Sequence, residues 1–242
     1  MDAAVVIPTI LRPTLVQAVQ SVFAQQFDGR VQILIGVDQP KGQATGVLDA
    51  ACAGRPSNCV VQALYAGYST SARHGGLCPA ADGGVLRCVL TLLANSPFVA
   101  HLDDDNWWAP DHLQSMRSAL ANAQWAFALR WFVHPVSEQP IAVDHWESVG
   151  PRSGIFNERF GGFVDPSCLI NKTACPDAVL AWNFPLFSAD PRSADRRVFQ
   201  LLSRRYQGAG TGSARVYYRM NPTDPIHGER LRRFGKLSDQ RD

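Results

Sequence analysis

One stretch decides how this chain is interpreted: Phe98-Val99-Ala100-His101-Leu102-Asp103-Asp104-Asp105-Asn106-Trp107-Trp108-Ala109-Pro110. An apolar run leads directly into three consecutive aspartates, and a proline typical of a helix start follows the two tryptophans. Ligands of open α/β sheets gather at the carboxyl ends of strands, so the stretch predicts a strand that ends in a binding site. Adjacent carboxylates repel one another unless a cation neutralises them, and their hard oxygens suit Mg²⁺, Mn²⁺ or Ca²⁺. A solvated acidic turn that begins the next helix is the alternative.

The composition limits the classes of protein to which the chain can belong. With 46% hydrophobic residues, the 242 residues can build a sizeable core. The formal net charge of +2 gives no support for a nucleic-acid-binding surface. No apolar run is long enough to span a bilayer, and residues 1–8 lack the basic segment of a signal peptide. The six cysteines contain no C-x-x-C pair, so we expect reduced thiols in a cytoplasmic protein.

Short apolar runs alternate with helical patterns in the first part of the chain. Apolar and β-branched runs predict strands at 3–7, 31–37, 59–65 and 98–102. Apolar residues at helical spacing predict helices at 14–27 and 85–94. This alternation predicts an α/β fold of doubly wound type, with a central, mostly parallel sheet flanked by helices.

The second part of the chain is less regular. Its patterns predict helices at 111–121 and 193–207 and strands at 124–133, 167–171 and 216–220. Residues 136–164 are irregular and contain several glycines and prolines, and loops of this length inside a domain usually carry function. The tail, 221–242, is basic and polar, which predicts a mobile segment with solvated side chains at Arg230, Arg232 and Arg233.

The order of these motifs resembles that of family 2 glycosyltransferases, inverting enzymes with the Rossmann-like GT-A fold, over roughly residues 3 to 205. Val5-Val6-Ile7-Pro8-Thr9 is similar to the family's strand that enters the nucleotide site, which implies donor contacts at Pro8 and Thr9. Asp38 falls where the family has an aspartate that binds the nucleobase, although Gln39-Pro40-Lys41 replaces the family's Asp-Gly-Ser. Ser71-Ala72-Arg73-His74-Gly75-Gly76 resembles the family's Ala-Arg-Asn-x-Gly segment, which implies that Arg73 lies near the donor's diphosphate.

Two acidic motifs complete the resemblance. Asp103-Asp104-Asp105 falls at the family's D-x-D motif, which implies that Asp103 and Asp104 contact the nucleotide and that Asp103 and Asp105 hold Mn²⁺ or Mg²⁺. Ser193-Ala194-Asp195-Arg196-Arg197-Val198-Phe199 resembles the family's Glu-Asp motif, with Ala194 in place of the glutamate, and implies Asp195 as the catalytic base. Asp190 is a competing candidate for the base, and an acid that merely begins a helix is the structural alternative for Asp195. Many GT-A enzymes bring a C-terminal histidine to the metal, which implies His227 as a ligand; an ordinary surface histidine is the alternative.

The resemblance implies metal-dependent, inverting transfer of a sugar from a nucleotide-diphosphate sugar, with UDP as the expected nucleotide, to an acceptor hydroxyl. The acceptor is a glycan, a lipid-linked molecule or a small molecule; no nucleic-acid partner and no transmembrane segment are expected, and peripheral membrane contact stays open. This chemistry needs a cation on the leaving group, a carboxylate that takes the acceptor's proton and a firmly held nucleotide. We interpret the chain as one GT-A domain with a nucleotide-binding half (1–110), an acceptor-binding half (111–220) and a tail (221–242) that acts as a lid.

Other interpretations stay open at this point. Loss of the glutamate before Asp195 favours a non-catalytic GT-A-like module that binds a sugar nucleotide, whereas the intact acidic motif argues against it. A sugar nucleotidyltransferase would carry glycine in the stretch 8–13, which has none. Trp107 and Trp108 are candidates for stacking on a sugar ring or for packing in the core. Asp144-His145-Trp146-Glu147 is a candidate for acceptor contact or for an exposed turn.

Overall fold

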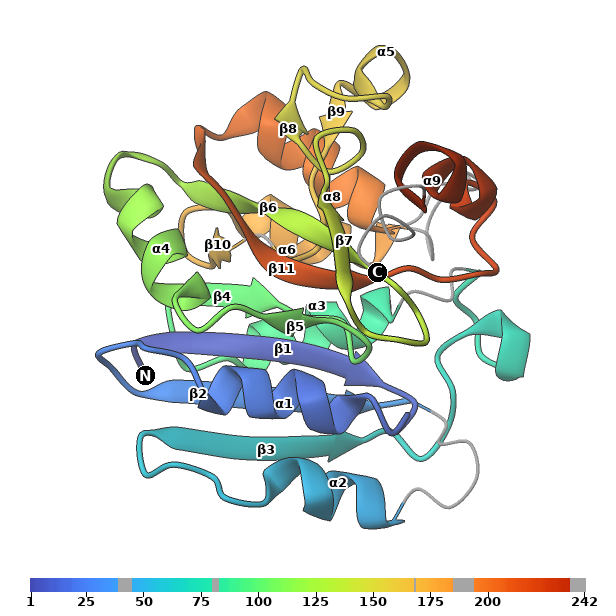
Figure 1. Cartoon of the computed structure of the whole chain (residues 1–242). Coiled ribbons are helices and arrows are strands. Elements are labelled where there is room, and N and C mark those ends of the chain that lie inside the picture. The colour runs from blue at the N-terminus through green and yellow to red at the C-terminus, as the bar shows by residue number, and fades with distance from the viewer. Residues whose placement is uncertain (39–44, 80–82, 168, 185–193, 236–242) are drawn as a thin grey trace.

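The computed structural model describes residues 1–38, 45–79, 83–167, 169–184 and 194–235. Within these ranges, a nine-stranded mixed sheet runs in the order β3-β2-β1-β4-β10-β6-β11-β5, and β7 pairs with β6 (Figure 1). Its strands are β1 (Ala3–Thr9), β2 (Val31–Val37), β3 (Cys59–Tyr65), β4 (Phe98–His101), β5 (Trp107–Trp108), β6 (Trp125–Val133), β7 (Pro140–Val143), β10 (Leu169–Asn171) and β11 (Gly208–Arg219). A separate two-stranded ribbon joins β8 (Gly150–Pro151) and β9 (Gly162–Phe163).

Helices cover both faces of this sheet. They are α1 (Leu15–Phe23), α2 (Thr45–Cys52), α3 (Gly84–Leu93), α4 (His112–Ala119), α5 (Asn157–Phe160), α6 (Pro176–Ala181), α8 (Ala194–Arg205) and α9 (His227–Phe234), with short 3₁₀ turns η1 (Ala72–His74) and η2 (Leu120–Asn122). In Figure 1, α1 lies in front of β2, and α2 lies below β3. Residues of α1 and α3 pack on opposite faces of β1. The predicted α/β architecture, a central sheet flanked by helices, is confirmed.

The parallel part of the sheet is buried on both faces. β1 pairs in parallel with β2 and β4, and β2 pairs in parallel with β3. Alternate residues of β1 point to opposite faces, so Val5 and Ile7 join Leu15 of α1 in one core, whereas Val6 joins Leu90 of α3 in another. Double burial explains why β1 and β2 are apolar almost throughout. The carboxyl ends of β1, β2 and β4 therefore form a rigid edge.

Antiparallel strands extend the sheet beyond β4. β10 pairs in the antiparallel sense with both β4 and β6, whereas β11 runs parallel to β6. On one face, α6 and α8 pack through an apolar cluster that includes Trp125, Trp182 and Val198. On the other face, Leu113 and Met116 of α4 join the cluster that contains β1. Both halves of the chain thus share one sheet.

Several boundaries differ from the prediction. The final strand, predicted at 216–220, begins at Gly208 in the structure. The prediction misses its first part because the glycines there are not typical of a strand. A Cβ at Gly208 would lie 2.4 Å from the Trp125 ring, and one at Gly210 would lie 3.0 Å from the Phe127 ring, so glycine lets β11 cross these rings. The stretch predicted as irregular, 136–164, contains β7, β8, α5 and β9. The sequence pattern predicts neither α2 nor β5.

The described part of the tail forms a helix, α9, and the prediction of a solvated arginine is wrong for Arg230. This residue is 2% exposed. Its guanidinium pairs with Glu147 and with Asp224, and these carboxylates compensate for the burial of its charge. Arg232 and Arg233 are exposed, as expected.

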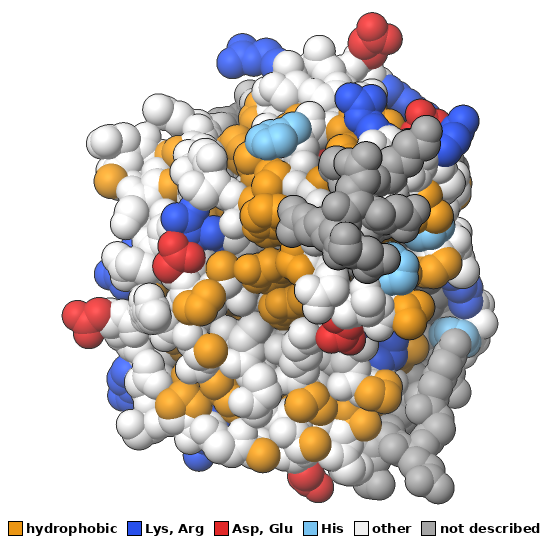
Figure 2. All heavy atoms as spheres, in the orientation of Figure 1, with side chains coloured by type: hydrophobic (Ala, Val, Ile, Leu, Met, Phe, Trp, Pro, Cys, Tyr) orange, Lys and Arg blue, Asp and Glu red, His pale blue; other side chains and the backbone are white. Residues whose placement is uncertain are grey.

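On the face shown in Figure 2, apolar side chains gather in a band over β6 and β11, while Lys and Arg side chains are scattered around it. In this region a hollow of about 390 Å³ is lined by Phe127, Leu129 and His145, together with glycines of β11. No helix in the described ranges is both long enough and apolar enough to cross a membrane.

Candidate functional site

A cavity of about 540 Å³ opens at the carboxyl ends of β1, β2 and β4. The predicted site residues that line it are Pro8, Thr9, Asp38, Arg73, Asp103, Asp104, Asp105 and Asp195. His227 is not among its described lining residues, and Asp190 lies outside the described part of the chain. The structure therefore brings the two acidic motifs, which are far apart in the sequence, to one cavity.

The three aspartates Asp103 to Asp105, called the acid turn below, have different partners. Arg87 of α3 pairs with Asp103, and its guanidinium carbon lies 5.2 Å from the centre of the Trp182 ring. The side-chain amide of Asn106 donates to the other oxygen of Asp103 at 3.3 Å. Burial raises the pKa of Asp103 to about 6, and the charge of Arg87 opposes that rise. Since Arg87 is 2% exposed, it is a fixed counter-ion for Asp103.

Asp104 and Asp105 share a second arginine, which comes from the loop after β1. Arg12 Nη2 lies 2.8 Å from Asp104 Oδ1, and Arg12 Nη1 lies 2.7 Å from Asp105 Oδ2. Thr9 also donates its hydroxyl to Asp104 Oδ2 at 2.6 Å. Burial raises the pKa of both carboxyls, and the charge of Arg12 opposes the rise. The side chain of Asp104 is 1% exposed and anchors the turn, whereas that of Asp105 is 30% exposed and more accessible.

The loop that carries Arg12 has a constrained backbone. Leu11 adopts a φ of 59°, in the left-handed region that residues other than glycine rarely occupy. Its N–H donates to the Thr9 hydroxyl oxygen at 2.8 Å. Backbone strain of this kind persists only where surrounding contacts hold it, and it is common at binding sites. Here the same threonine holds both the loop and Asp104.

Asp38 holds the loop that contains Arg73. Its carboxylate accepts hydrogen bonds from the Ser69 hydroxyl at 2.8 Å and from the Thr70 N–H at 2.7 Å. The loop turns tightly at Gly76, where a Cβ would lie 2.3 Å from the Thr70 carbonyl group. Each carboxylate oxygen can accept more than one hydrogen bond, so Asp38 can still accept one from a ligand. The following residues, 39–41, lie outside the described ranges.

Asp195 lies in the first turn of α8. Its carboxylate accepts a hydrogen bond from the Arg196 N–H at 2.7 Å. The Arg196 guanidinium carbon lies 3.6 Å from the centre of the Phe163 ring, and burial lowers the pKa of this arginine. Ala194, at the position of the family's glutamate, is fully buried in the apolar cluster of α8. A helix start also stabilises a carboxylate, so the position of Asp195 fits both a catalytic and a structural role.

Arg130 of β6 organises a cluster of acids that the sequence did not reveal. Its guanidinium donates to the carboxylates of Asp144, Glu147 and Asp165 at 2.8, 2.9 and 2.9 Å. All four side chains are buried. A lone arginine within the apolar stretch 125–133 indicates that an acidic side chain is buried beside it. The sequence alone does not identify that acidic residue.

The segment Asp144-His145-Trp146-Glu147 is consequently not the exposed turn that was one of its two interpretations. Asp144 and Glu147 point inward because Arg130 requires their charges, and Glu147 lines the cavity together with Tyr218. The Tyr218 ring centre lies 3.9 Å from the Arg130 guanidinium carbon, and burial raises the pKa of Tyr218 to about 12. Acceptor contact by this segment stays a prediction.

The two tryptophans after the acid turn lie in different environments. Trp108 is 3% exposed and belongs to the core. Trp107 stacks on Tyr217, with ring centres 5.2 Å apart, and the Arg219 guanidinium carbon lies 5.4 Å from the Trp107 ring. Arg219 Nε donates to the backbone carbonyl of Asp105 at 3.3 Å, so this stack supports the acid turn. Neither tryptophan is among the described lining residues of the cavity.

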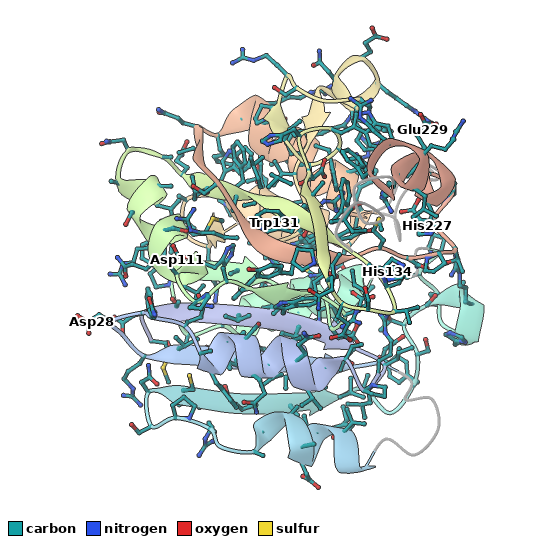
Figure 3. The ribbon with its side chains drawn as sticks, in the orientation of Figure 1. Asp28, Asp111, Trp131, His134, His227 and Glu229 are labelled. Carbon is teal, nitrogen blue, oxygen red and sulfur yellow. The ribbon has the colours of Figure 1, made fainter. Side chains whose placement is uncertain are left out.

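The acid turn has the donor chemistry of a divalent-cation site. Mg²⁺ and Mn²⁺ prefer oxygen ligands, and Mg²⁺ usually takes one or two carboxylates together with substrate phosphates. Across the described ranges, no group of three or more His, Cys, Asp or Glu side chains is arranged to hold a metal. His227 lies at the start of α9, where its N–H donates to the Asp224 carbonyl at 2.9 Å (Figure 3). Asp103 and Asp105 carry carboxylate oxygens of the kind that such a cation prefers, and their role as metal ligands, like that of His227, stays a prediction.

No family model matches the chain, and no curated protein matches it in sequence. Among solved structures, S. aureus TarS is similar, with a TM-score of 0.66 and 14% identity over 96% of this chain and 39% of that chain. TarS 1-349 in complex with UDP-GlcNAc has a TM-score of 0.61 and 13% identity over 93% of this chain and 60% of that chain. The mannosyltransferase PcManGT from Pyrobaculum calidifontis, in complex with GDP-Man and Mn²⁺, has a TM-score of 0.58 and 11% identity over 96% of this chain and 60% of that chain. The chain thus spans between 39% and 60% of each of these chains, and the likeness shows that its fold is GT-A-like.

Proposed function

We propose that this protein is a metal-dependent, inverting glycosyltransferase that uses a nucleotide-diphosphate sugar, with UDP as the nucleotide and the acid turn as the D-x-D motif of family 2. One observation carries the proposal: the acid turn at the end of β4 and Asp195 at the start of α8 line the same cavity. The fold supports it, since similar solved structures hold UDP-GlcNAc or GDP-Man.

The donor lies in the nucleotide-binding half, 1–110, in this proposal. Asp38 accepts a hydrogen bond from the ring N–H of the base, and Pro8 and Thr9 contact the nucleoside. Arg73 pairs with the diphosphate, whose oxygens suit the planar guanidinium. All four residues line the cavity, which supports these assignments.

Asp103 and Asp105 would hold Mn²⁺ or Mg²⁺, with His227 as a further ligand. A cation bound there supplies Lewis-acid stabilisation of the diphosphate leaving group. The residues around the turn keep it charged and in place, because Arg87 pairs with Asp103 while Thr9 fixes Asp104. Asp103 also contacts the ribose or the sugar of the donor.

Asp195 acts as the general base. Its carboxylate takes the proton of the acceptor hydroxyl as that oxygen bonds to the anomeric carbon and the bond to the diphosphate breaks, which inverts the configuration. The acceptor lies in the half 111–220, where Glu147 and Tyr218 line the cavity. Asn221 and Asp224 also line it, which supports a covering role for the segment 221–242.

Titration with UDP, GDP, ADP and UDP-sugars, with and without Mn²⁺, tests this proposal. A bound donor at a hundred times its Kd adds about 2.7 kcal/mol to stability, which a thermal melt detects. We expect this stabilisation with UDP-sugars in Mn²⁺ and its loss on adding EDTA. No stabilisation by any nucleotide would contradict the proposal. Binding without turnover of any donor would favour the non-catalytic module, for which the replacement of glutamate by Ala194 is the supporting observation.

A further inference from the structure

Two arginines pair with the acid turn, and they differ in accessibility. The side chain of Arg87, on Asp103, is 2% exposed, whereas that of Arg12, on Asp104 and Asp105, is 48% exposed. Arg12 also lines the cavity. The acid turn therefore has one fixed counter-ion and one that solvent and ligands can reach.

Charge balance gives Arg12 a role that Arg87 does not share. With both arginines paired, the three ionised aspartates leave the group with one negative charge. Without Arg12, the group carries two negative charges, which one divalent cation balances. Asp105 Oδ2 is the oxygen that Arg12 Nη1 contacts at 2.7 Å, so a cation that takes this oxygen must displace the guanidinium.

We propose that Arg12 is an exchangeable counter-ion of this site. It pairs with Asp104 and Asp105 as the structure shows, leaves Asp105 when a divalent cation binds there, and then pairs with the diphosphate oxygens of the donor. This inference rests on the proposed function, which supplies the diphosphate. A guanidinium group suits this exchange, because its planar set of N–H donors can pair with the oxygens of a carboxylate or of a phosphate.

The loop around Arg12 allows such an exchange without unfolding the site. The Thr9 hydroxyl holds both the Leu11 N–H and the Asp104 carboxylate, and neither hydrogen bond involves the Arg12 side chain. Asp104 thus keeps a partner when the guanidinium departs. The cation and the nucleotide then assist each other, since the cation frees the arginine that the diphosphate needs, and this coupling is reciprocal.

Mn²⁺ binding in the absence of nucleotide tests the exchange directly. Electron paramagnetic resonance or calorimetry would give the Mn²⁺ affinity of the full chain and of Arg12→Gln. We expect Arg12→Gln to bind Mn²⁺ about three- to tenfold more tightly, as one or two partly exposed ion pairs no longer compete. Arg12→Lys, which keeps the charge, should stay nearer to the wild type. Thermal melts would establish that each variant is folded.

Arg73→Gln is the matched control, because it removes one positive charge from the same cavity. In the described residues, Arg73 forms no ion pair with the acid turn, so its replacement should change Mn²⁺ affinity by about twofold or less. Equal Mn²⁺ affinity in the wild type and Arg12→Gln would overturn the exchange, as would an equal gain in Arg73→Gln or an absence of Mn²⁺ binding in every variant.

UDP titrations separate this inference from the proposed function. In the wild type, Mn²⁺ should raise the affinity for UDP by the same factor by which UDP raises the affinity for Mn²⁺. We expect this factor to be smaller in Arg12→Gln. Normal nucleotide binding with an unchanged Mn²⁺ affinity in Arg12→Gln would overturn the exchange and leave the function standing. Tighter Mn²⁺ binding in Arg12→Gln without nucleotide binding by any variant would overturn the function and the diphosphate step.

Discussion

Arg230 of α9 donates to both carboxylate oxygens of Glu147, at 2.6 Å from Nε and 2.7 Å from Nη2. The pair ties the C-terminal helix to the segment between β7 and β8. Glu147 also accepts from Arg130 at 2.9 Å, so α9 is joined to the charged cluster beside the cavity. The last helix is therefore part of the site's support.

Replacing this arginine by methionine, Arg230→Met, should destabilise the protein by about 3 kcal/mol, because removing one partner of a buried ion pair leaves an incompletely compensated charge. Breaking a buried ion pair costs about 3–5 kcal/mol. We expect the lower end of this range because Glu147 keeps Arg130 as a partner. Urea unfolding measures the change. Arg232→Met is the control in the same helix: its side chain is 78% exposed, and we expect a change below about 0.5 kcal/mol. Equal effects of the two changes would refute the anchoring role of Arg230.

Stability should fall at acid pH because of His112, which is fully buried and whose pKa burial lowers to about 3. The unfolded chain binds this proton below about pH 6.5, whereas the folded chain does not, so acid favours the unfolded state between these values. One such group contributes up to about 1.4 kcal/mol per pH unit. Urea unfolding at several pH values should show a shallower loss in His112→Phe, whose ring can still stack on Trp108.

Nuclear magnetic resonance gives an independent measure for the same residue. The imidazole signal that disappears in His112→Phe should keep a constant chemical shift from about pH 7 to pH 4, well above the folded-state pKa. A signal that titrates near its ordinary value would show that His112 is accessible, contrary to its burial.

Gly76→Ala should weaken nucleotide binding by about tenfold, since a Cβ there would lie 2.3 Å from the Thr70 carbonyl group and displace the loop that holds Arg73. Calorimetry with UDP measures the loss. Gly46→Ala is the matched control: its Cβ would meet nothing within 4 Å, and it lies in α2, none of whose described residues lines the cavity. We expect its UDP affinity to equal that of the wild type. An unchanged UDP affinity in Gly76→Ala would show that the loop does not contact the donor.

The parallel half of the fold was predictable because its signals are local. The continuous apolar residues of β1 and β2 predict strands that are buried on both faces. The acid turn follows the end of β4 closely in the sequence. The cavity indeed lies at this edge of the sheet. A strand end therefore identifies the place of a site from sequence alone.

The elements that the sequence did not reveal depend on distant partners. α9 has only Leu231 and Phe234 as apolar residues, and the residue it buries is Arg230. An ion pair that joins segments far apart in the chain therefore helps to hold this helix. The acids around Arg130 come from two further segments, 144–147 and the stretch after β9 that contains Asp165, and no spacing rule connects these segments with Arg130. β11 begins with glycines, and the reason for them is the aromatic rings of β6, which leave no room for a Cβ at Gly208 and little room for one at Gly210.

Asp38 should make the site selective for the base. A carboxylate can accept a hydrogen bond from the ring N–H of uracil or guanine, and adenine has no such donor. We therefore expect UDP and GDP to bind more tightly than ADP in calorimetric titrations. Asp38→Ala would remove both the base contact and the loop contacts, so Ser69→Ala serves as the control that weakens the loop alone. Tighter binding of ADP than of UDP and GDP would exclude this role.

Asp195→Asn should separate catalysis from binding. The asparagine keeps the size of the side chain and an oxygen that accepts the Arg196 N–H, but it cannot take a proton from the acceptor. A general base contributes about 10²–10⁴-fold to the rate, so transfer should fall by that factor while UDP affinity changes by about twofold or less. Release of UDP from a donor that the wild type turns over measures the first effect, and calorimetry measures the second. Asp190→Asn is the matched comparison, and it should stay active. If Asp190→Asn is inactive while Asp195→Asn turns over normally, Asp190 is the base, and the charge of Asp195 serves the start of α8 instead.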